Sequence, residues 1–459
     1  MKERVHIPER VFITRAEEVE ATLRRAARRA LLAHKRAGNP VATWRDGRVA
    51  LIPPEEIPVE EAVGGEGSDS APGAPARATA PDERLSEQPT DEKTVRRLAA
   101  TPRALVGETF FVTGFPGFIA GRLVERLALE GARFQLLVQP AFAARARADV
   151  ARISAETGAP PENFRLMEGD ITREGLGLSP SDLGEARAAA TAVFHLAAVY
   201  DLGVARELAV RVNVEGTRNV NLFAKSVRGL RRYHYVSTCY VAGRRTGRIL
   251  ETELRHGAGF RNNYEETKYL AEVEVDALKG ELPVTIHRPA VVCGDSRTGE
   301  TAKYDGVYYL INYLRIFPRA LSLANIGNRD VRLNVVPVDF VVEAMAALAR
   351  DETSAGETVQ LADPAPLTTE ELFDVISRNL AGRDSLFTLP APVVRTTLNI
   401  PFNERVTGLP RVGVPYFFLK QTYDTARATA LLAPSGVRCP RFPDYAPALI
   451  DFVERHPRL

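Results

Sequence analysis

The stretch TGFPGFIAG, residues 113–121, follows an apolar run and precedes a helical pattern at about residues 119–129. Gly114 permits a tight turn at the end of a strand, Gly117 lets the backbone approach a pyrophosphate, and Ala120 lets the helix pack closely on a sheet. The first amide groups of such a helix face bound phosphates. The spacing G-x-x-G-x-x-A departs from the commoner G-x-G-x-x-G, and an ordinary Gly-rich turn shows the same pattern. The stretch therefore predicts a strand, a turn and a helix, and a dinucleotide site is one interpretation of the turn.

Strand-like and helical patterns alternate from this turn onward, which is typical of βαβ units. We therefore predict an α/β fold of the Rossmann type, with a doubly wound parallel sheet and a smaller C-terminal substrate-binding region. The predicted strands lie at residues 109–113, 134–138, 164–167, 192–196, 232–237, 284–288 and 334–338.

The first hundred residues differ in composition from the rest. Residues 12–38 show an Arg- and Ala-rich helical pattern, and residues 41–52 hold two apolar runs around an Asp-Gly turn, which favours a hairpin. We predict a small helix and hairpin module over residues 1–55. It is either a docking or oligomerisation element, with nucleic-acid contact as a further option, or an Arg-rich helix packed on its own hairpin. The arginines that could make that contact are Arg24, Arg25, Arg28 and Arg29.

Residues 56–102 are rich in Gly, Ser, Ala and Pro and contain few apolar residues that could offset the entropy of ordering. They predict a flexible linker. The remaining residues, 103–459, form the predicted Rossmann domain, in which substrate contacts are expected mainly from residues 295–330 and 385–459.

Charge and composition exclude several classes of protein. The chain of 459 residues carries 60 basic and 58 acidic side chains, so no global field favours nucleic acid. Three cysteines without CxxC spacing argue against a disulfide framework or a structural zinc site, and we expect no metal. The N-terminus lacks a signal-peptide core and no run of about 18 apolar residues appears, so we expect a cytoplasmic protein without a transmembrane segment. Peripheral membrane contact and the oligomeric state stay open.

A candidate catalytic set follows the fifth predicted strand. Tyr264 and Lys268 are four residues apart and therefore share one face of a helix, and Thr238 stands among hydroxyl residues where the strand ends. A hydroxyl donor, a phenol acid and a nearby ammonium could together bind a carbonyl oxygen and protonate it. Because a free tyrosine has a pKa of about 10, we expect Lys268 to lower the pKa of Tyr264.

The residues after the second strand bear on the choice of cofactor. Gln139 stands where an NAD-specific fold has an acidic residue that binds the ribose. Arg145 and Arg147 follow closely and could neutralise a 2′-phosphate, although both could also lie on an exposed helix face without binding a ligand. The sequence favours NADP, with NAD as the alternative.

Several motifs occur in order along residues 105–459, and together they resemble the extended short-chain dehydrogenase/reductase family. The motifs are TGFPGFIAG (113–121), GDI (169–171), FHLAA (194–198), NVEGT (213–217), VSTCYVAG (236–243), YEETK (264–268), HRP (287–289) and GDS (294–296).

The resemblance implies a role for each matching residue. It implies that Asp170 and Ile171 bracket the adenine, that Asn213 supports the active-site helix, and that Lys268 contacts the nicotinamide ribose. Ala197 and Ala198 would line the cofactor path. The full set of expected cofactor residues is Thr113, Gly114, Phe115, Gly117, Phe118, Ile119, Gln139, Arg145, Asp170, Ile171, Ala197, Ala198, Asn213, Tyr264, Lys268 and Pro289.

Within that family the chain most resembles the fatty acyl-CoA reductase and thioester reductase branch of the male-sterility type, through Thr238 and the stretches RPAVVCGDSRTGE (288–300), NVVPVDFVVEAM (334–345) and CPRFPDY (439–445). Gln139 departs from the arginine frequent there. The resemblance implies an NAD(P)H-dependent oxidoreductase that reduces an acyl thioester of coenzyme A or a carrier protein to an aldehyde; whether a second reduction gives an alcohol stays open. The alternatives are a carbonyl reductase or hydroxysteroid-type dehydrogenase, a nucleotide-sugar epimerase, and a dinucleotide-sensing regulatory protein.

Overall fold

The computed structural model describes residues 41–45, 48–52, 55, 104–398 and 411–459. The chain divides into two units, one containing β1 (Val41–Arg45) and β2 (Arg48–Ile52), the other containing every element from β3 onward. β1 and β2 pair in antiparallel fashion, as the Asp-Gly turn predicts. The predicted helix at residues 12–38 and the predicted linker lie outside the described residues.

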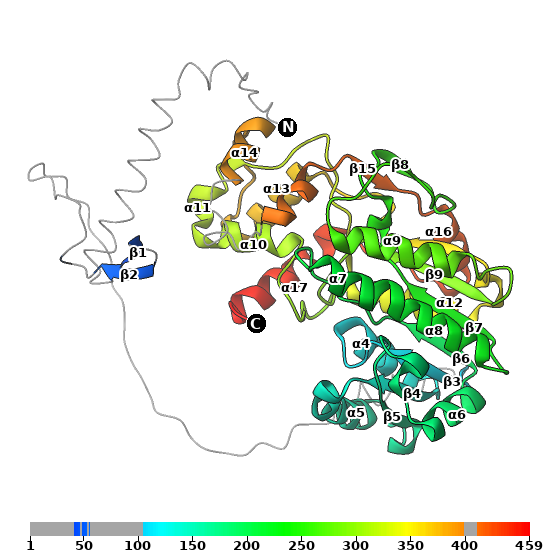
Figure 1. Ribbon diagram of the computed structural model, residues 1–459. Coiled ribbons are helices and arrows are strands. Elements are labelled where there is room, and N and C mark those ends of the chain that lie inside the picture. The colour runs from blue at the N-terminus through cyan, green and yellow to red at the C-terminus, as the bar shows by residue number, and fades with distance from the viewer. Residues whose placement is uncertain (1–40, 46–47, 53–54, 56–103, 399–410) are drawn as a thin grey trace, which may run out of the picture. The chain divides into compact units, whose positions relative to one another are not determined.

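A parallel seven-stranded sheet forms the centre of the larger unit, with the order β13-β9-β7-β6-β3-β4-β5 (Figure 1). β3 lies between β4, the next strand of the chain, and β6, so the winding direction reverses at β3. In such sheets ligands bind at the carboxyl ends of the strands beside this reversal. The bounds are β3 (Thr109–Thr113), β4 (Arg133–Val138), β5 (Phe164–Glu168), β6 (Ala192–His195), β7 (Arg232–Val236), β9 (Val284–Pro289) and β13 (Thr358–Leu361).

Six of the seven predicted strands lie in this sheet, and the seventh prediction is wrong about its place. Residues 334–338 contain β12 (Val335–Pro337), which pairs with β10 (Val291–Cys293) in a separate two-stranded sheet. The seventh strand of the main sheet is instead β13. An apolar run indicates that a segment is buried, but it does not say which sheet the segment joins.

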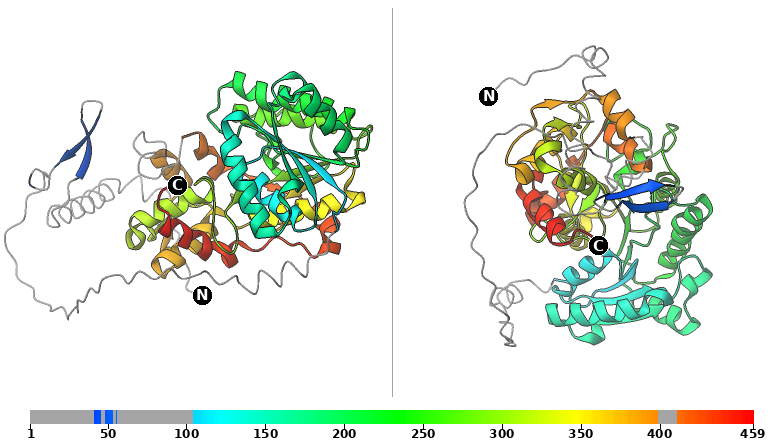
Figure 2. Two further views of the ribbon diagram at one scale, coloured as in Figure 1. Left: turned by 90° about the horizontal axis from the view of Figure 1, so that it is seen from below. Right: turned by 90° about the vertical axis from the view of Figure 1, so that its left-hand side faces the viewer.

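Helices cover both faces of the sheet because its strands are apolar on both sides. In β3, for example, Phe110 packs into one core and Phe111 into the other. Figure 2 shows the sheet between the two helix layers. One layer contains α4 (Phe118–Ala128), α5 (Ala143–Thr157), α12 (Val338–Arg350) and α16 (Ala426–Leu432), and the other contains α6 (Pro180–Ala189), α8 (Gly216–Ser226) and α9 (Asn263–Asp276).

A third core, around Tyr308, Phe373 and Leu449, holds the C-terminal region together. The helices of the C-terminal region lie beside one end of the main sheet (Figure 1). They are α10 (Val307–Ile316), α11 (Pro318–Leu321), α13 (Thr369–Ala381), α14 (Ala391–Leu398) and α17 (Phe442–Arg455). The short strands β11 (Ala324–Asn325) and β14 (Phe387–Thr388) pair here, and β15 (Gln421–Tyr423) pairs with β8 (Gly247–Ile249). Within the described parts of the chain, no helix has the length and hydropathy needed to cross a bilayer.

Candidate active site

The glycine loop forms a tight turn between β3 and α4. Gly114 has a φ of +91°, and a Cβ there would lie 2.8 Å from the backbone nitrogen of Ala197, so only glycine fits without strain. A Cβ at Gly117 would lie 2.6 Å from the carbonyl oxygen of Gly114, a contact within the loop itself. No side chain caps the N-terminus of α4, which leaves its first amides available for an anion. The loop therefore has the form of a pyrophosphate cradle.

A cavity of about 1010 Å³ opens at this loop. All the predicted cofactor and catalytic residues line it except Asn213. The structure therefore brings together residues from six separate motifs, as their positions at the ends of parallel strands predict.

Asn213 lies behind the cavity wall. It is buried in a π-helical turn, Val210–Glu215, that leads into α8. Its Oδ1 accepts a hydrogen bond of 2.8 Å from the backbone nitrogen of Val199, and its Nδ2 donates to Oγ1 of Thr267 at 3.0 Å. Asn213 thus ties the loop after β6 to α9, the helix that carries Tyr264 and Lys268.

Thr238 and Tyr264 both line the cavity, and the Thr238 hydroxyl lies close enough to the phenol to affect its pKa. Burial raises the pKa of Tyr264 and the nearby Thr238 hydroxyl opposes this shift, so the phenol holds its proton throughout the neutral range. The neighbouring hydroxyl of Ser237 instead donates to the buried carboxylate of Glu272. The two adjacent hydroxyl residues therefore serve different partners.

Lys268 does not lower the pKa of Tyr264 in this geometry. Its Nζ donates to the phenol oxygen of Tyr235 at 2.9 Å and to the carbonyl oxygen of Val236 at 2.8 Å, and burial lowers its own pKa to about 7. The pKa of Tyr264 is raised, not lowered. The expected lowering fails because desolvation of the buried phenol dominates.

The sequence pattern did not reveal the role of His195, which lies in the FHLAA motif. Nδ1 of His195 lies 2.7 Å from Oγ1 of Thr113, and Nε2 lies 3.0 Å from Oγ1 of Thr217. Since the Thr217 hydroxyl donates to the carbonyl of Asn213, it must accept from Nε2. The Thr113 hydroxyl therefore donates to Nδ1 while accepting from the amide of Ala197. This buried chain fixes the ends of β3 and β6 beside the glycine loop.

The outer part of the cavity holds the residues that bear on cofactor choice. Arg145, on α5, is 61% exposed and lies 3.8 Å from Asp149, so its guanidinium is accessible. Arg147 is exposed but does not line the described cavity. Oδ1 of Asp170 accepts hydrogen bonds from the backbone and hydroxyl of Thr172, both at 2.9 Å, which holds the turn that contains Ile171.

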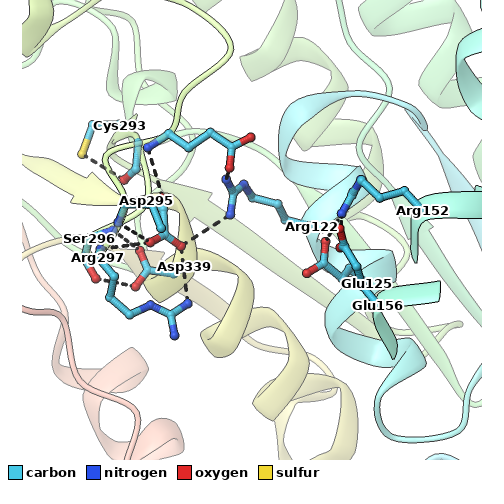
Figure 3. A network of polar contacts seen from close by, with 12 residues as sticks. Arg122, Glu125, Arg152, Glu156, Cys293, Asp295, Ser296, Arg297 and Asp339 are labelled. Atoms are coloured by element: carbon cyan, nitrogen blue, oxygen red, sulfur yellow. Dashed lines mark hydrogen bonds and ion pairs between the residues drawn. The ribbon is translucent and has the colours of Figure 1, made fainter. Parts of the chain in front are cut away.

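A polar network joins α4 to the segment that follows β10 (Figure 3). Arg122 contacts Asp295 at 3.4 Å and Glu300 at 2.8 Å, while Asp339 of α12 accepts from the backbone and hydroxyl of Ser296. Asp295 also accepts from the backbone nitrogens of residues 297 and 298. These contacts fix the loop that leads to residues 301–306 of the cavity wall.

The opposite wall is aromatic and comes from the C-terminal region. Tyr416 lines the cavity beside Phe417, and its hydroxyl donates to the buried carboxylate of Glu265 at 2.6 Å and accepts from Asn262 at 2.8 Å. Its ring also packs edge-on against Tyr240, with centroids 4.9 Å apart. The wall is thereby anchored to the start of α9, next to Tyr264.

Comparison with known proteins places these features in context. The family model described as male sterility protein, an NAD-binding domain, matches residues 112–345. "Fatty acyl-CoA reductase wat" of Drosophila melanogaster is 26% identical over 211 residues, which cover 40% of this chain and 41% of that protein. "Fatty acyl-CoA reductase 2, chloroplastic" of Arabidopsis thaliana is 23% identical over 354 residues, covering 59% and 57% respectively. The matched regions are thus less than two thirds of these relatives.

Solved structures agree on the fold. The terminal R domain from the myxalamid PKS-NRPS biosynthetic pathway superposes with a TM-score of 0.65 at 23% identity, covering 80% of this chain and 98% of that domain. A thiolation-reductase di-domain from an archaeal non-ribosomal peptide synthetase gives a TM-score of 0.61 at 16% identity, covering 79% and 80%. The Rossmann fold and the resemblance identified from the sequence are both confirmed, and the cofactor class is a nicotinamide dinucleotide. The chain belongs to the male sterility protein family of NAD-binding domains.

Proposed function

We propose that this protein is an NADPH-dependent reductase that converts an acyl thioester of coenzyme A or a carrier protein into an aldehyde and a thiol. The observation that carries the proposal is that the hydroxyl residues Thr238 and Tyr264 line one cavity, which extends from the glycine loop to an aromatic wall. The activities named for the two fatty acyl-CoA reductases support the thioester as substrate.

The dinucleotide would extend along the sheet edge. The glycine loop and the first amides of α4 would hold its pyrophosphate, while Asp170 and Ile171 would flank the adenine. Arg145 would pair with a 2′-phosphate, which favours NADP over NAD because an exposed guanidinium can form two charge-assisted hydrogen bonds with it. Lys268, which donates to Tyr235 in this structure, would also donate a hydrogen bond to the nicotinamide ribose.

Residues of this chain would bind and protonate the carbonyl oxygen. The bound reduced nicotinamide supplies a hydride. The hydroxyls of Thr238 and Tyr264 would hold the thioester oxygen, stabilise the charge that develops there, and Tyr264 would protonate it. Collapse of the resulting thiohemiacetal releases aldehyde and thiol. Phe417 and Tyr416 would exclude water from the acyl chain.

The test is NADPH absorbance at 340 nm with purified full-length protein. Long-chain acyl-CoA, the matching aldehyde, a ketone panel and a nucleotide sugar are supplied in turn, with NADH as the parallel cofactor. Loss of NADPH on acyl-CoA with stoichiometric free thiol is the expected result, and further loss on the aldehyde would show a second reduction to the alcohol. Turnover of aldehydes or ketones alone would make the protein a carbonyl reductase. No loss of NADPH on any substrate would favour the epimerase, whose reaction consumes no net NADPH, or the sensor.

A further inference from the structure

A second acid lies in the same cavity as Tyr264. Asp305 stands between β10 and α10, and its side chain is 15% exposed. The cavity is lined by both Asp305 and Tyr200. The Asp305 carboxyl group lies close enough to the Tyr200 phenol to raise its pKa, and the Tyr200 ring meets the Tyr264 ring edge-on, with centroids 5.2 Å apart at 79°. Tyr200 therefore links the carboxyl group to the candidate proton donor.

Burial favours the protonated form of Asp305, against one facing cation. Lys303 is the cation that faces it, with Nζ 3.8 Å from Oδ2 and 5.0 Å from the Tyr200 ring centroid. Burial raises the pKa of Asp305, while Lys303 and the nearby Tyr200 hydroxyl oppose the shift without cancelling it. Tyr264 on α9 and Tyr200 after β6 are the other titratable groups in this cluster. Tyr264 is buried and its pKa is raised, whereas Tyr200 is 51% exposed, so solvent moderates the upward shift of its pKa.

Reduction of a thioester needs two protonation events at different atoms. The oxygen is protonated by Tyr264 in the proposed function, and the sulfur departs afterwards as a thiolate. An alkyl thiol has a pKa of about 8.5, so a departing thiolate gains from a proton donor at neutral pH. A donor with its own position in the cavity leaves Tyr264 free to take back the hydroxyl proton.

We propose that Asp305 is the general acid that protonates the departing sulfur, an inference that rests on the proposed function. The C–S bond breaks and its electron pair moves to sulfur, while the carboxyl proton of Asp305 forms the S–H bond. The hydroxyl proton of the thiohemiacetal returns to the phenolate of Tyr264 as the C=O bond forms. Solvent then reprotonates Asp305. One hydride and one proton are consumed for each aldehyde and thiol.

The experiment compares Asp305→Asn with the wild-type protein on two thioesters of one acyl group. The acyl-CoA releases an alkyl thiol, whereas the thiophenyl ester releases a more acidic thiol that departs without a proton. Single-turnover NADPH oxidation is measured with enzyme in excess, so product release does not limit the rate. We expect Asp305→Asn to lose roughly 100-fold on the acyl-CoA, and less than about threefold on the thiophenyl ester. Equal losses on both esters, or no loss on the acyl-CoA, would overturn the role of Asp305.

Two further variants complete the test. Tyr200→Phe removes the hydroxyl partner of Asp305 and should produce a smaller loss with the same leaving-group dependence. Asp451→Asn, on the exposed surface of α17, makes the same charge change away from this cavity and should match the wild type. NADPH affinity, measured by fluorescence, checks that each variant is folded.

The wild type alone gives a second readout. Its rate on acyl-CoA should fall as pH rises through the raised pKa of Asp305, whereas the rate on the thiophenyl ester should not follow that transition. Parallel pH profiles would contradict the inference even if Asp305→Asn fails to fold. A wild type that reduces aldehydes but neither thioester would refute the proposed function and this role together, whereas thioester turnover with equal losses refutes only the role of Asp305.

Discussion

Gly114→Ala offers the most direct test of the glycine loop. The backbone at Gly114 has a φ of +91°, and an added Cβ would meet two backbone atoms, the nitrogen of Ala197 at 2.8 Å and the carbonyl carbon of Leu196 at 2.9 Å. A left-handed backbone conformation costs a non-glycine residue about 1–2 kcal/mol, and overpacking against rigid neighbours costs about 1–3 kcal/mol more. We therefore expect a total penalty of roughly 2–5 kcal/mol.

The penalty would appear in two measurements. If the loop keeps its conformation, the penalty remains as strain and lowers the free energy of unfolding in urea. If the loop moves to relieve the strain, the cofactor site is distorted and NADPH affinity falls, by tenfold for each increment of about 1.4 kcal/mol. Gly121→Ala is the matched control from the same stretch, since a Cβ there meets nothing within 4 Å and the residue lies within α4. That control should gain up to about 1 kcal/mol of stability. If Gly114→Ala equals the control in both measurements, the close contact between the glycine loop and the segment that follows β6 is refuted.

Three other perturbations test the rest of the site. Tyr264→Phe should lower kcat at least roughly 100-fold while the NADPH dissociation constant stays within about twofold, because the change removes the proton donor and leaves the ring and the other cofactor residues in place; fluorescence titration and steady-state rates decide this. Arg145→Ala should weaken NADPH by about tenfold and leave NADH nearly unchanged, and equal losses would remove Arg145 from the 2′-phosphate site. Backbone amides of residues 297 and 298 and two arginines lower the pKa of Asp295 against the effect of burial. The ionised Asp295 therefore stabilises the fold above its unfolded pKa of about 4, and this contribution is lost as pH falls through the depressed folded value. Asp295→Asn should accordingly reduce the fall in unfolding free energy at acid pH, measured by urea unfolding. An unchanged acid dependence would contradict that contribution.

The sequence was sufficient to predict six of the seven strands of the main sheet and the cavity residues that come from the motifs. Parallel strands place their carboxyl ends along one edge, so motifs that follow separate strands must meet there, and Thr113, Ala197 and Thr238 do line one cavity. The helical spacing of Tyr264 and Lys268 predicts their shared face in the same way. Such periodic and topological signals are local and therefore visible in a chain without coordinates.

The sequence could not predict contacts between side chains from unrelated segments. Asp305 follows Tyr264 by 41 residues and lies outside any strand or helix, so no periodicity links them. Nor could the pattern show that Ser237 bonds Glu272 while the Thr238 hydroxyl lies near Tyr264, because adjacent residues differ only in which way they point. The direction of the Tyr264 shift was wrong for a related reason: burial of the phenol is a tertiary property.

The active-site motif extends one turn further along α9 than the sequence pattern suggests. Tyr264, Lys268 and Glu272 recur at intervals of four residues, so an acid, an ammonium and a carboxylate share one helix face. Glu272 is held by Arg288, with Nε 2.8 Å from Oε1, and it raises the pKa of Lys268 against the larger effect of burial, leaving that pKa at about 7. Without Glu272, desolvation alone would drive the pKa of Lys268 lower and the amine would be neutral at pH 7. The positive charge that the cofactor ribose would meet therefore depends on a carboxylate that does not line the cavity.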